Sequence, residues 1–167
     1  MTRDEVVTRF TAERAAFDRR IEAMDAASFN RIPPGRAHSP KEIVAHVTAY
    51  ERLIVERLRA ARAGETTAFD RDRAGWQPFN ERVWRETAGL EDDEVRAQAG
   101  AVFADLLDEV ARLTDKDLNE STALNRFIDP AWLEGRALWE LVAIDGFDHY
   151  PMHFAALDDA LVEGEDD

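Results

Sequence analysis

The stretch SPKEIVAHVTAYERLIVERL, residues 39–58, predicts a capped amphipathic helix and sets the fold class. Ser39 supplies an N-cap hydroxyl, Pro40 stands where its missing N–H does no harm, and Glu42 completes a capping box. Apolar residues then recur at steps of three and four along one face: Ile43, Val47, Tyr50, Ile54 and Leu58. Gly64 is the expected C-terminal stop.

Three further helices are predicted around this one. The first covers residues 2–26, where the apolar stripe consists of Val6, Phe10, Phe17, Ile21 and Met24. The third begins between Trp76 and Phe79, is expected to break at Gly89, and continues to Leu113. Strand patterns are absent except for a doubtful few residues near 121–128.

The fourth helix is predicted from Arg136 to Leu161. Pro151 leaves a carbonyl one turn earlier without its helical partner, so we expect a kink there. The preceding connection, residues 114–135, contains apolar residues that we expect to cover the end of the bundle: Phe127, Ile128 and Trp132.

The polar linker at residues 64–75 carries topological information. A dozen extended residues span about 40 Å, which matches a helix of about 24 residues, about 36 Å long. The linker can therefore return along the bundle and allow the second and third helices to lie parallel. We predict one all-α domain, a four-helix bundle in residues 1–162 with long connecting loops, followed by a disordered acidic tail at 163–167.

Composition excludes several function classes. With 35 acidic against 21 basic residues the formal charge is −14, which disfavours nucleic-acid binding. No apolar run approaches the roughly 18 residues of a membrane helix, and the charged start MTRDEVVTRF does not resemble a signal peptide. The chain has no cysteine, which excludes disulfides and protein thiolate ligands. We expect a cytoplasmic protein.

Three of the four histidines are candidate metal ligands. His149 and His153 stand at i and i+4 on the fourth helix, which places both rings on one face. His46 lies between inward-facing positions of the second helix and can supply a third nitrogen. Three imidazoles leave a position for water or substrate, as in reactive metal sites.

Asp145 extends this stripe by one further turn toward the start of the fourth helix. It is a candidate fourth ligand, a partner of a ligand, or a base. Polar groups in a core-facing stripe need a partner, and a divalent cation is one solution. The alternative is a set of core histidines that are satisfied by Asp145 and Asp148, with no metal.

The order of motifs resembles the DinB-like superfamily, and within it the ClbS/DfsB-type branch. Four segments carry the resemblance: SPKEIVAH at 39–46, FNERVW at 79–84, LWELVA at 138–143, and DHY at 148–150 followed by His153. The resemblance implies parallel second and third helices, a three-histidine site for a divalent ion, often Ni²⁺ or Zn²⁺, and frequent homodimers. His38 stands where the family often has Trp, and Asp145 where the branch often has Asn.

The function we expect is a metal-dependent enzyme acting on a small molecule, by hydrolysis or by activation of a low-molecular-weight thiol cofactor. Asp145 or Tyr50 could move the proton. Trp76, Asn80 and Trp84 are candidates for the substrate pocket. The alternative function is a non-catalytic protein that sequesters a small molecule for self-resistance or stress.

Overall fold

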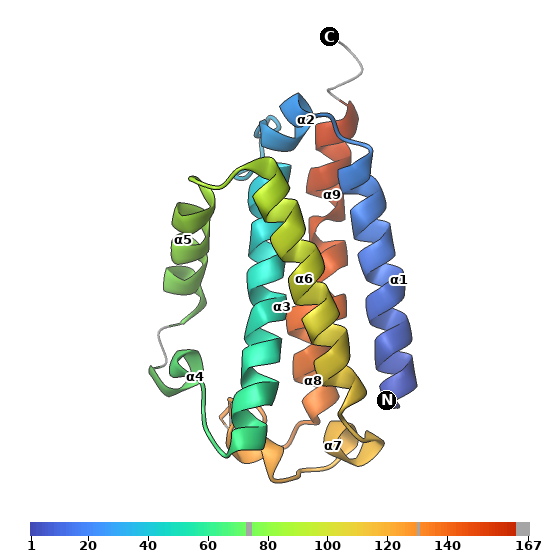
Figure 1. The fold of residues 1–167 in the computed structure, drawn as a ribbon, viewed down its shortest axis with the longest axis vertical. Helices are drawn as coiled ribbons and strands as arrows, with labels where there is room; N and C mark the ends of the chain where they lie inside the picture. Colours follow the sequence, from blue (N-terminus) through green and yellow to red (C-terminus); the bar gives the residue numbers. More distant parts are fainter. Residues whose placement is uncertain (73–74, 130, 163–167) are drawn as a thin grey trace.

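The computed structural model describes residues 1–72, 75–129 and 131–162, and helices are the only regular secondary structure within these ranges. Four long segments lie side by side in Figure 1: α1 (Arg3–Glu22), α3 (Pro40–Ala63), α6 (Asp92–Ala111), and α8 (Leu138–Val142) continued by α9 (His149–Val162). Short helices occupy the connections: α2 (Ala26–Asn30), α4 (Ala68–Asp72), α5 (Trp76–Thr87) and α7 (Asp115–Asn119). The all-α class is confirmed for these residues.

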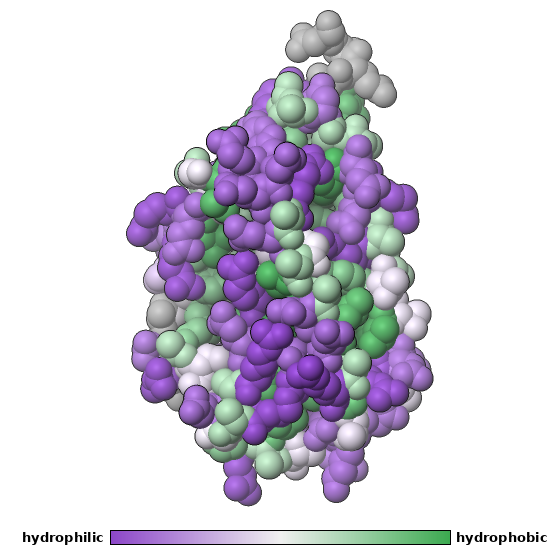
Figure 2. Space-filling view, viewed as in Figure 1, coloured by the Kyte–Doolittle hydropathy of each residue, from purple (hydrophilic) through white to green (hydrophobic). Residues whose placement is uncertain are grey.

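The long helices run in the directions that the length of the 64–75 linker suggests. Figure 1 shows α3 and α6 running from the top of the view to the bottom, whereas α1 and α9 run upward. The connection from α3 to α6 contains α4 and α5, which lie along one side of the bundle. Hydrophilic residues cover most of the face in Figure 2, and no helix among the described residues is long and apolar enough to cross a membrane.

Helix α3 begins and ends where its sequence predicts. The Ser39 hydroxyl accepts a hydrogen bond from the Glu42 amide, and the Glu42 carboxylate accepts one from the Ser39 amide at 2.8 Å. The helix ends at Gly64, whose φ of 76° lies in the left-handed region that favours glycine. Because α3 packs against α5, α6 and α9, its residues supply much of the core.

Several boundaries differ from the predicted ones. The first helix ends at Glu22, and α2 follows an Asp25 N-cap that accepts a hydrogen bond from Ser28. The third is two helices, α5 and α6, which separate around Gly89 as expected. Residues near 121–128 contain a 3₁₀ turn rather than a strand. Of the apolar residues expected at the bundle end, Ile128 is fully buried, and Phe127 and Trp132 pack on the core. The tail at 163–167 lies outside the described residues.

The fourth helix is interrupted before Pro151. Residues Ala143–Phe147 form a π-helical turn, and Gly146 inside it has non-helical torsion angles. A Cβ at Gly146 would lie 2.4 Å from Cζ of Phe10, so only glycine permits this approach to α1. Pro151 lies in the first turn of α9, where its missing N–H costs little, so the expected break lies earlier in the chain.

Candidate metal centre

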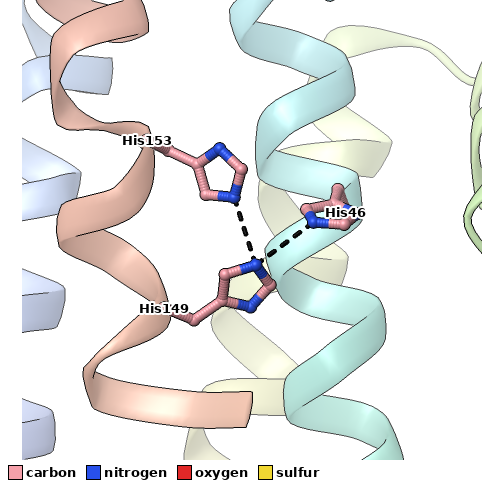
Figure 3. Close-up of side chains that lie close together, drawn as sticks. All are labelled: His46, His149 and His153. Carbon is pink, nitrogen blue, oxygen red and sulfur yellow. Dashed lines mark hydrogen bonds between the residues drawn. The ribbon is translucent and has the colours of Figure 1, made fainter. Parts of the chain in front are cut away.

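The structure brings His46, His149 and His153 together between α3 and α9. His149 is the first residue of α9 and His153 lies one turn later, while His46 faces them from α3 (Figure 3). Nε2 of His149 lies 3.2 Å from Nε2 of His46 and 3.2 Å from Nε2 of His153. All three ligand atoms lie within 4.8 Å of one another, so the cluster could hold a metal ion. The predicted convergence is therefore confirmed.

Two of the three nitrogen separations fit a tetrahedral ion. A tetrahedral ion with metal–nitrogen bonds of about 2.05 Å places neighbouring nitrogens about 3.3 Å apart. The observed separations of 3.2 Å match that edge closely. Three neutral imidazoles suit zinc, nickel or copper better than calcium or magnesium, which prefer oxygen ligands.

Burial keeps the imidazoles neutral, the form that binds a metal. It lowers the pKa of His46 to about 3 and of His149 to about 4, and repulsion from the neighbouring rings adds to both shifts. The pKa of His153 is also lowered, chiefly by burial and then by His38. Nδ1 of His46 and Nδ1 of His149 are buried and make no hydrogen bond of good geometry.

The two aspartates expected to satisfy the histidines bind arginines instead. The Arg57 guanidinium donates to Asp145 at 2.7 Å, and Arg9 donates to Asp148 at 3.0 Å on the surface. Among the described residues neither carboxylate accepts a hydrogen bond from a histidine. The structure therefore contradicts the interpretation in which Asp145 and Asp148 hold metal-free core histidines.

Arg57 is a site residue that the sequence reasoning missed. It is 1% exposed and donates three hydrogen bonds to Asp70 as well as one to Asp145. Burial raises the pKa of Asp145 to about 6, although Arg57 opposes part of that rise. One signal was present: Arg57 follows the inward-facing Ile54 by three residues, which places it on the buried side of α3.

Two cavities flank the histidines. The first, of about 220 Å³, has walls that include Tyr50, Arg57, Trp76, Asp145 and His149. The position of Asp145 and Tyr50 in this wall is compatible with the proton transfer expected of them. Nearby, the Tyr50 ring lies with its centroid 4.5 Å from that of His149.

The second cavity, of about 210 Å³, has walls that include Trp84, His46 and His153. His38 also lines it and stacks on Trp84 with ring centroids 4.0 Å apart, although the sequence placed His38 outside the site. The predicted pocket residues are therefore divided, because Trp76 faces the first cavity and Trp84 the second. Asn80 lines neither of them and accepts a hydrogen bond from the Tyr50 hydroxyl at 3.2 Å.

A family model described as the DinB superfamily matches residues 9–143, which is most of the chain. His46 lies inside the matched segment, whereas His149 and His153 follow it. No curated protein and no solved structure matches the chain.

Proposed function

Because the chain belongs to the DinB superfamily, we propose that it binds one divalent metal ion through His46, His149 and His153 and acts as a metal-dependent enzyme on a small molecule. The observation that carries this proposal is the convergence of three Nε2 atoms beside an open cavity of about 220 Å³. A purely structural site would be closed by a fourth protein ligand, and no further His, Cys, Asp or Glu joins the cluster among the described residues.

The ion, when bound, lowers the pKa of a water or thiol and polarises a substrate carbonyl. The three imidazoles would hold it between α3 and α9, and the first cavity would admit the substrate beside His149. Asp145, with a pKa raised to about 6, can accept a proton near neutral pH. Tyr50 has a raised pKa because of burial, so its hydroxyl stays protonated and acts as a donor.

The nucleophile is either water, which gives hydrolysis, or a low-molecular-weight thiol, which gives transfer. A thiol must come from outside the chain, because the sequence has no cysteine. Placement in the ClbS/DfsB-type branch, assembly as a homodimer and a cytoplasmic location belong to the same proposal, and rest on the motif resemblance and the composition.

Metal analysis of untagged protein tests the proposal. After supplementation with zinc or nickel and removal of excess ion, we expect one ion per chain in the wild type. His153→Ala should lose most of the metal, because two nitrogens hold the ion less well than three. His38→Ala is the matched control, since it removes a nearby imidazole that lies outside the cluster, and it should keep the ion. Wild-type protein without metal would show the proposal to be wrong.

A further inference from the structure

Two polar contacts tie the interrupted fourth helix to α3 on either side of His149. Four residues before it, Asp145 accepts a hydrogen bond from Arg57. One residue after it, the Tyr150 hydroxyl donates a hydrogen bond to the Glu51 carboxylate. His149 itself stands three residues after the non-helical Gly146, so no continuous α-helix on its N-terminal side fixes its rotation.

Glu51 is held in a fixed position by burial and by a second hydrogen bond. Its side chain is 0% exposed, and it also accepts a hydrogen bond from Arg14 of α1 at 3.1 Å. Arg14 is held in turn by Asp18, one turn later on α1, at 2.7 Å. The carboxylate therefore joins α1, α3 and α9 in one buried polar network, close to the level of the histidine cluster.

We propose that Glu51 is a positioning residue for the histidine cluster and acts through Tyr150. The Tyr150 ring is fully buried against Phe17, so its hydroxyl fixes the rotation of the first turn of α9. Since His149 is the adjacent residue, the same contact sets the direction of its imidazole toward His46. Metal ligands must be held within about 0.5 Å of their binding positions, so loss of the Tyr150–Glu51 hydrogen bond weakens metal binding. The inference rests on the metal site proposed above.

The test is Tyr150→Phe, which removes one buried hydroxyl and keeps the ring. Residues that hydrogen-bond to metal ligands typically contribute about 10–100-fold to affinity, and Tyr150 acts one residue further from the ion, so we expect zinc to bind about tenfold more weakly. The affinity is measured by competition with a chelating dye. Thr87→Val is the matched control, because Thr87 is also buried and donates its hydroxyl to a helical carbonyl, in α5. It should lower the melting temperature by a similar amount and leave zinc affinity unchanged.

Glu51→Gln distinguishes an effect on the position of His149 from an effect on the stability of the fold. The amide keeps an oxygen that can accept the Tyr150 hydrogen bond, but it leaves Arg14 without its buried counter-charge. We expect a clear fall in melting temperature with zinc affinity close to that of the wild type. The proposal is overturned if Tyr150→Phe binds zinc as tightly as the wild type, or if Thr87→Val weakens binding equally.

A second readout does not depend on the metal. ¹⁵N spectra of the histidine ring nitrogens in metal-free protein report the contacts of His149 with its neighbours. Tyr150→Phe should shift the His149 signals and Thr87→Val should not. If the wild type takes up no zinc, the metal proposal fails, and these spectra alone decide for or against the positioning role. Unchanged His149 signals in Tyr150→Phe would overturn it.

Discussion

Replacement of Arg57 by methionine should strongly destabilise the protein, because it leaves two buried carboxylates without their cation. The side chains of Asp70 and Asp145 are 1% and 7% exposed, and both hydrogen-bond to this guanidinium. Loss of one partner from a buried ion pair costs about 3–5 kcal/mol. For a domain of this size each kcal/mol lowers the melting temperature by about 2–4 °C, so we expect a fall of about 6–20 °C.

The stability lost in Arg57→Met should be smaller at acidic pH. In the wild type, Asp145 already has a pKa raised to about 6, and the methionine variant removes the charge that opposes that rise. A carboxyl whose pKa is higher in the folded than in the unfolded state binds protons on folding, so a lower pH favours the folded state. The variant has the larger shift, so its deficit relative to the wild type should be smaller at pH 5 than at pH 8.

Urea denaturation of wild type, Arg57→Met and Arg52→Met at both pH values measures these effects. Arg52 also lies on α3 but is exposed, so its replacement makes the same charge change at little cost, below about 1 kcal/mol. A cost for Arg57→Met as small as that of the control, or a deficit that grows at pH 5, would refute the reasoning.

Three further predictions concern the same region. Gly146→Ala places a Cβ against Phe10 and should lower the free energy of unfolding by about 1–3 kcal/mol, as measured with denaturant. An unchanged denaturation midpoint would show that Phe10 and α1 can move aside without loss of stability. In metal-free protein, His46 and His149 have folded pKa values of about 3 and 4 and take up protons mainly on unfolding, so they lower stability as pH falls below about 6.5. Asp145 and Glu51, whose pKa values burial raises to about 6 and about 7, act in the opposite direction. His149→Phe should therefore gain stability relative to the wild type between pH 7 and pH 5, and an unchanged difference between the two proteins would contradict this. Asp145→Asn keeps an acceptor for the guanidinium, so metal content should persist while activity falls; loss of the ion would indicate direct ligation instead.

The sequence predicts those parts of the fold that local chemistry determines. The capping box at Ser39 and the stop at Gly64 involve neighbouring residues only, and both lie where expected. The spacing of His149 and His153 likewise fixes their common face once α9 is helical. Placing His46 opposite them needed only its position on the apolar stripe of α3.

The rest depends on contacts between distant segments. The break at Gly146 is stabilised by close approach to Phe10, which no pattern within the fourth helix indicates. The partners of Arg57 lie 13 and 88 residues away along the chain, so its burial as an ion pair has no local signature. His38 joins the second cavity because the loop before α3 folds against Trp84 of α5.

The central claim is that His46, His149 and His153 share one metal ion, and anomalous X-ray diffraction from zinc-loaded crystals tests it most directly. We predict a single strong peak at the zinc edge between α3 and α9, about 2.0–2.1 Å from Nε2 of each histidine. That peak should disappear in crystals of His153→Ala grown in the same way. A map with no peak at this position, or with zinc bound only by surface carboxylates, would contradict the account.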